Sequence, residues 1–206
     1  MRRKMKNKIG LIGISFLLIS GMVYGETVQD LSYNNTNALA YDEDINYPYI
    51  SGYGDGTFKP EQAVTREELA TMLARIITKN RIPDEENRYQ DMIEGRFSTN
   101  AVNYITQLGI MKATNHHTFK PTNNVSIKEF NEVVEQLSPY IKNNDVTLPT
   151  GKGFLTRSQV VITLNDLFNV QCNTYHTSAP FKDIKPGSPE YEAILCATQP
   201  QGESVP

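Results

Sequence analysis

An internal repeat constrains the fold of this 206-residue chain more than any other feature of its sequence. Residues 57–65 (TFKPEQAVT) recur 61 positions later as residues 118–126 (TFKPTNNVS). Residues 64–68 (VTREE) recur 91 positions later as residues 155–159 (LTRSQ). Repeats of this length indicate supersecondary units that bury their apolar faces against one another. The chain is therefore expected to form an array of similar units.

Each copy predicts a capped helix. Thr65, Ser126 and Thr156 can each cap a helix N-terminus, and a Glu or Gln three residues later completes a capping box. Apolar residues then follow at the i, i+3, i+4, i+7 spacing of an amphipathic helix. Two shorter helices are expected over 98–109 and 188–199, and no sustained period of two predicts a strand. The fold class is therefore expected to be mainly α.

The ends of the array are offset. An aromatic-x-Asp element occurs as Tyr89-x-Asp91 before the second copy and as Phe181-x-Asp183 after the third. The first copy has no such element before it. We therefore expect the last short helix to pack beside residues 45–58, which would supply the missing half-unit and close the array.

These motifs resemble the S-layer homology (SLH) family. Residues 52–60 (GYGDGTFKP) and 64–70 (VTREELA) match its pattern closely, the second copy keeps TFKP and a Ser cap, and the third keeps Thr156 and Arg157. The resemblance implies that tandem SLH repeats form a helical pseudo-trimer. It divides the chain into SLH motif 1 at 45–80, SLH motif 2 at 81–141, and a degenerate SLH motif 3 with a C-terminal half-unit at 142–206.

The resemblance also implies a function. SLH motifs anchor exported proteins non-covalently to the bacterial cell wall, by binding a secondary cell-wall polysaccharide that is often pyruvylated, or modified peptidoglycan. No cofactor, metal or enzyme activity is expected. The alternative is a structural or protein-interaction module of the cell envelope whose degenerate motifs bind no glycan. The resemblance makes no prediction of oligomeric state.

Arginines at two helix starts are the first candidates for glycan binding. Arg66 and Arg157 each follow a cap, where free backbone N–H groups and a guanidinium together suit a carboxylate. Ile127 replaces the Arg in the second copy, where Lys128 is a partial substitute. The other interpretation is that Arg66 pairs with neighbouring acidic residues as a surface charge.

The Gly-rich loop before the first helix supplies the remaining candidates, Tyr53, Gly54, Asp55 and Gly56. Asp-Gly favours a tight turn, and glycines allow positive φ and close backbone approach. The loop is thus expected to turn the chain into the helix and to line a groove for sugar.

The N-terminus predicts export. Residues 1–25 combine a basic start with an apolar run shorter than the roughly 20 residues that span a bilayer, which is typical of a cleaved signal peptide. An uncleaved anchor is the alternative; after cleavage no transmembrane segment is expected. Residues 26–44 are expected to be a flexible lead segment. The sequence after residue 25 has a net charge of −8, which disfavours nucleic-acid partners.

Two cysteines, Cys172 and Cys196, follow the signal segment. Because an exported chain permits disulfides, the pair is a candidate disulfide. The alternative is two buried thiols that pack as small hydrophobic groups.

Overall fold

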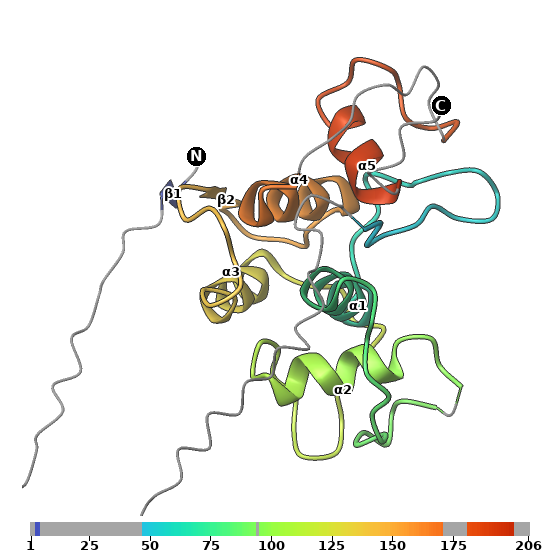
Figure 1. Ribbon diagram of the computed structural model, residues 1–206, viewed down its shortest axis with the longest axis vertical. Helices are drawn as coiled ribbons and strands as arrows, with labels where there is room; N and C mark the ends of the chain where they lie inside the picture. Colours follow the sequence, from blue (N-terminus) through green and yellow to red (C-terminus); the bar gives the residue numbers. More distant parts are fainter. Residues whose placement is uncertain (1–2, 5–46, 94, 171–180, 200–206) are drawn as a thin grey trace, which may run out of the picture. The chain divides into compact units, whose positions relative to one another are not determined.

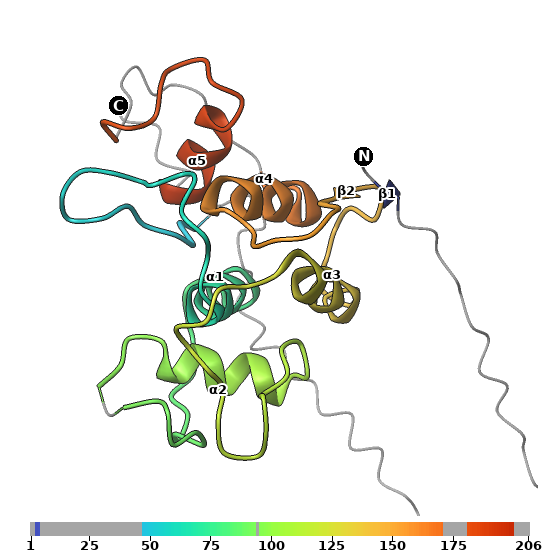
Figure 2. The ribbon, with the colours of Figure 1, turned by 180° about the vertical axis from the view of Figure 1, so that it is seen from behind.

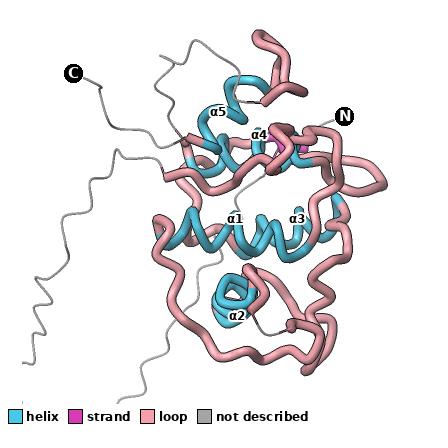
Figure 3. Tube along the Cα trace, turned by 90° about the vertical axis from the view of Figure 1, so that its right-hand side faces the viewer, coloured by secondary structure: helices cyan, strands magenta, loops and turns pink. Residues whose placement is uncertain are grey.

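The computed structural model describes residues 3–4, 47–93, 95–170 and 181–199 of the chain. In this part the fold is mainly helical, as expected (Figure 3). The helices are α1 (Arg66–Thr78), α2 (Thr99–Gln107), α3 (Ile127–Gln136), α4 (Arg157–Phe168) and α5 (Tyr191–Thr198). Two short strands, β1 (Arg3–Lys4) and β2 (Thr147–Leu148), pair antiparallel. Since β1 falls within the predicted signal peptide, cleavage would remove this pairing.

The three predicted helix caps are confirmed. Thr65, Ser126 and Thr156 each accept a hydrogen bond from the backbone N–H three residues on. The capping box is complete at Thr65 and Thr156. The expectation of a complete box at Ser126 is wrong, because the Glu129 side chain turns away and pairs with Arg66.

A closed ring of backbone hydrogen bonds joins the three helix starts. Val64 N–H donates to Leu155 O, Leu155 N–H donates to Val125 O, and Val125 N–H donates to Val64 O, at 2.8–3.0 Å. All three side chains have no exposed surface. Each helix therefore begins at a point that the other two copies hold in place.

The short helices pack on the outside of this centre. α2 lies against α1, and α5 lies against α4 (Figures 1 and 2). The core between them contains the apolar stripes of the capped helices and the two Phe side chains of the TFKP elements, Phe58 and Phe119, which are completely buried.

Each aromatic-x-Asp element caps a TFKP element. The Asp91 carboxylate accepts hydrogen bonds from the backbone N–H groups of Phe119 and Lys120 at 2.9 and 2.6 Å. Asp183 does the same for Phe58 and Lys59 at 2.8 and 2.7 Å. The aromatic residue of each element contacts the Phe of the same TFKP element: Tyr89 packs on Phe119, and Phe181 packs on Phe58.

The predicted closure of the array is thereby confirmed. The N–H groups of Tyr49 and Ile50 both donate to the carbonyl of Ala197 on α5, at 3.0 and 3.3 Å. A Cβ added at Gly52 would clash with the Phe181 ring at 2.1 Å, so the chain needs a glycine there. The C-terminal element thus packs on the loop that begins the first copy.

Replacing Asp183 by Ala should lower the free energy of unfolding by about 1–2 kcal/mol, because two charge-assisted hydrogen bonds are lost from an exposed carboxylate. Although burial raises the pKa of Asp183, the backbone donors of Phe58 and Lys59 lower it more. Urea denaturation measures the change. An equal effect from Asp166→Ala, an exposed control on α4, would contradict the assigned role.

Several expectations concern other parts of the chain. The apolar run of the signal peptide, the lead segment 26–44 and Cys172 lie outside the described residues. Among the described residues, no helix has the length and apolar character needed to cross a membrane. Cys196 is buried on α5, and its pairing with Cys172 stays a prediction that the intact mass of the unreduced protein would check.

Candidate functional site

Two grooves lie at equivalent places in the first and second copies. The first groove, of about 250 Å³, is lined by Tyr49, Ile50, Ser51, Gly52, Tyr53, Glu68, Thr71, Met72, Arg75, Phe97 and Arg157. The second groove, of about 380 Å³, is lined by Ile110, Lys112, Ala113, Thr114, Ser126, Val133 and Arg66, with the polar residues Lys128, Glu129, Glu132, Glu135 and Gln136 of α3. Each groove therefore combines a loop, the capped helix after it, and an arginine from another copy.

Arg157 binds the protein itself in the first groove. Its Nε donates to Phe58 O at 2.8 Å and its Nη2 donates to Ser51 O at 2.8 Å. Its Nη1 lies 3.4 Å from the Glu68 carboxylate, and its guanidinium carbon lies 4.6 Å from the centre of the Phe58 ring. With only 3% of its surface exposed, Arg157 ties the loop to α1.

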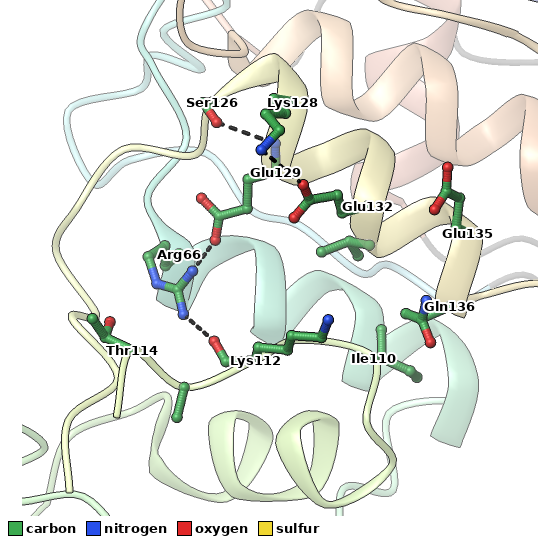
Figure 4. A pocket seen from close by; sticks show the side chains of 12 residues that line it. Arg66, Ile110, Lys112, Thr114, Ser126, Lys128, Glu129, Glu132, Glu135 and Gln136 are labelled. Carbon is green, nitrogen blue, oxygen red and sulfur yellow. Dashed lines mark hydrogen bonds and ion pairs between the residues drawn. The ribbon is translucent and has the colours of Figure 1, made fainter. Parts of the chain in front are cut away.

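Arg66 repeats this arrangement in the second groove. Its Nε donates to Phe119 O at 2.8 Å, its Nη2 donates to Lys112 O at 2.7 Å, and its Nη1 pairs with Glu129. Figure 4 shows the guanidinium between the loop and α3. The interpretation that Arg66 pairs with acidic residues close in sequence is wrong, because its partner belongs to the next copy.

The expectation of free N–H groups at these helix starts is also wrong. The backbone N–H of Arg66 donates to Asn123 O at 2.8 Å, and that of Arg157 donates to Gln62 O at 2.9 Å. Ile127 N–H likewise donates to Gly153 O at 3.0 Å. The loop of a neighbouring copy thus occupies each position where an anion was expected to bind.

The predicted loop residues divide into two groups. Tyr53 lines the first groove, but Lys59 lies 4.0 Å and Arg157 4.9 Å from the centre of its ring. Its partial burial raises the pKa of its hydroxyl, and Glu68 at 3.5 Å raises it further. Cations therefore already contact this ring.

Gly54, Asp55 and Gly56 form the exposed tip of the loop and do not line the described grooves. Asp55 closes the turn by accepting from the backbone N–H of Thr57 at 3.0 Å and from its hydroxyl at 2.5 Å. These hydrogen bonds lower the pKa of Asp55. Gly56 has a φ of +78°, which favours glycine at this position.

Lys128 lines the second groove with a side chain that is 88% exposed, and it pairs with Glu132 at 3.3 Å one turn along α3 (Figure 4). It therefore does not take the place of the arginine. The inward position of the second groove belongs to Arg66, which comes from the first copy.

Arg75 and Phe97 are among the residues of the first groove that sequence reasoning did not select. Arg75 lies in the last turn of α1, and Phe97, which is 69% exposed, lies just before α2. Neither belongs to a recurring motif: the position 61 residues after Arg75 is Gln136, and the position 92 residues after Phe97 is Pro189. The packing of α2 on α1 brings Phe97 into the lining of the groove that also contains Tyr53.

Six of the eleven residues that line the first groove lie in a segment that matches a known family. A model of the S-layer homology domain matches residues 49–70, which include the 49–53 loop and the first turns of α1. Residues 49–70 thus resemble an S-layer homology motif. The match contains the loop residues and Glu68 of the first groove. The other lining residues lie outside it: Thr71, Met72, Arg75, Phe97 and Arg157.

Two curated proteins of Acetivibrio thermocellus resemble part of this chain. Cell surface glycoprotein 1 is 29% identical over 100 residues, which is 48% of this chain and 4% of that protein. The cellulosome-anchoring protein is 26% identical over 106 residues, which is 48% of this chain and 24% of that protein. The chain thus spans at most about a quarter of the length of either relative.

Proposed function

We propose that this protein is an exported, non-catalytic module that anchors non-covalently to the bacterial cell wall by binding a wall glycan in the first groove. The glycan is a secondary cell-wall polysaccharide or modified peptidoglycan. The observation that carries the proposal is that the residues matching the S-layer homology family form one wall of a groove with an exposed aromatic ring. The names of the two relatives, a cell surface glycoprotein and an anchoring protein, support a surface location.

The proposed architecture is a closed helical pseudo-trimer. The ring formed by Val64, Val125 and Leu155 supports it, because each of the three copies donates one hydrogen bond and accepts one. In this arrangement the loops and the starts of the capped helices form grooves between copies. The signal peptide is removed on export. Ile127 of the second copy keeps the equivalent backbone contact, to Gly153 of the third copy, but stands where the other two copies have an arginine.

Phe97 is the residue best suited to test glycan binding. Sugar rings pack on exposed aromatic faces, and the Phe97 ring lines the groove while most of its surface remains accessible. Alanine at Arg66 or Arg157 would be a poor first test, because both side chains hold the fold together.

Phe97→Ala should weaken binding to purified cell walls by about 1–2 kcal/mol, or roughly 5–30-fold. The substitution removes the aromatic ring on which the sugar packs, and aromatic side chains contribute much of the binding energy at interfaces. Co-sedimentation of the folded protein with walls measures the affinity. Phe154→Ala is the matched control, because Phe154 is 58% exposed and does not line either groove. Equal binding by both variants and the unmodified protein would contradict the assignment of the groove.

A structural or protein-interaction role is the second candidate, and one observation favours it. Ile93 and Phe97 lie four residues apart and are both more than two-thirds exposed. An apolar pair of this kind also suits a protein surface. Walls stripped of protein separate the two functions: a glycan-binding module sediments with them, whereas a protein-binding module does not.

A further inference from the structure

The two arginines that line the first groove differ in how many donors they have free. All three nitrogen positions of Arg157 contact acceptors of the protein. Arg75 makes one long hydrogen bond, from Nη1 to Tyr49 O at 3.4 Å, and its guanidinium has no other partner among the described residues. Most of the donor capacity of Arg75 is therefore available to a ligand.

Arg75 is also the charge that remains unbalanced in this groove. The charged residues of the lining are Glu68, Arg75 and Arg157, and Glu68 pairs with Arg157. Arg75 is half-buried, and burial lowers its pKa. A guanidinium nevertheless keeps its proton at neutral pH, so its poorly solvated charge gains from an anion that enters the groove.

The second groove does not share this property. Gln136 stands where the repeat would place the equivalent of Arg75. Arg66 pairs with Glu129 and Lys128 pairs with Glu132, which leaves Lys112 and Glu135 as charges of opposite sign (Figure 4). The lining of the second groove is therefore balanced, whereas that of the first has an excess positive charge.

We propose that Arg75, rather than Arg66 or Arg157, binds an anionic substituent of the wall glycan, and that it does so in the first groove. This inference rests on the proposed function and adds the residue that recognises the charge of the ligand. Arg75 donates a forked pair of hydrogen bonds to a carboxylate or phosphate oxygen pair, while Phe97 packs on the adjoining sugar ring. Tyr53 and Arg157 hold the loop wall in place.

Arg75→Gln tests the proposal, because it gives the first groove the residue that the second groove has at the equivalent position, Gln136. The affinity for purified cell walls should fall at least tenfold, and it should depend less on salt than that of the unmodified protein. Arg75→Lys keeps the charge and should retain much of the salt dependence. Arg88→Gln, which removes an exposed charge outside both grooves, should bind normally. Far-ultraviolet circular dichroism checks that each variant is folded.

Soluble competitors identify the anion. Displacement of the unmodified protein by oligogalacturonate assigns a carboxylate, and displacement by a glycerol-phosphate polymer assigns a phosphate. Displacement by neither overturns the assignment of an anionic ligand. Normal binding by Arg75→Gln together with weak binding by Phe97→Ala overturns the role of Arg75 but leaves the proposed function intact. Failure of the unmodified protein to bind walls overturns the proposed function itself.

Discussion

Replacing Arg157 by Ala should lower the free energy of unfolding by about 3–5 kcal/mol, the largest effect of any substitution considered for this protein. The side chain is almost completely buried, so its removal leaves the Phe58 and Ser51 carbonyls without their donors. It also leaves the Glu68 carboxylate without a counter-charge, and it removes the guanidinium that packs on Phe58. Urea denaturation followed by circular dichroism measures the loss.

Two other variants provide comparisons for the stability of Arg157→Ala. Lys152→Ala, in the exposed loop before α4, should change stability by no more than about 0.5 kcal/mol. Arg66→Ala should give an intermediate loss, because the Arg66 side chain is 11% exposed and water can partly replace it. If Arg157→Ala proves as stable as Lys152→Ala, the buried hydrogen bonds of Arg157 do not support the fold.

Replacing Glu67 by Ala should cost about 2–3 kcal/mol, because it breaks a largely buried ion pair between α1 and the segment before α2. Glu67 accepts from Arg96 Nε at 2.6 Å and Arg96 Nη2 at 2.5 Å, and from the buried Ser98 hydroxyl at 2.6 Å. Alanine would leave all three donor groups, two on Arg96 and one on Ser98, without their acceptor. Thermal or urea unfolding measures the change.

Acid should remove the same stabilisation. Burial raises the pKa of Glu67, but the hydrogen bonds from Arg96 and Ser98 and the charge of Arg96 outweigh it and lower the pKa below its ordinary value. A carboxylate with a lowered folded pKa contributes fully above the unfolded pKa of about 4.3, and the contribution is lost as pH falls through the folded pKa. The stability difference between the unmodified protein and Glu67→Gln should therefore shrink below about pH 4. Asp55 and Asp183 also have lowered pKa values, but they are present in both proteins and cancel. A difference that grows in acid would contradict the assignment.

Local rules were sufficient to predict the elements of this fold. The Thr and Ser caps, the amphipathic stripes and the buried Phe58 and Phe119 all depend on spacings of a few residues, and the structure confirms them. The closure by α5 was also predictable, because the offset aromatic-x-Asp elements left one copy incomplete.

The candidate site was less predictable, because its residues act through partners that are distant in sequence. Arg157 binds carbonyls 99 and 106 residues away, and Arg66 binds a carboxylate 63 residues away. A motif shows that an arginine recurs but not whether its donors are free. Arg75 and Phe97 recur in no copy, so the repeat gave no reason to select them, and only the packing of α1 against α2 places them in one groove.

The contact of Tyr49 and Ile50 with Ala197 limits the ways in which the protein can unfold. Because the two ends of the described array are joined, neither end can separate from the rest without breaking the hydrogen bonds of Tyr49 and Ile50 to Ala197. A protease cut in the exposed segment 144–145 would leave the two pieces held together by the remaining contacts. For the same reason, a permuted chain that links the ends near Tyr49 and Ala197 and begins in that segment should reach the same fold. A protein whose two ends are joined in this way resists stepwise unravelling when it is pulled.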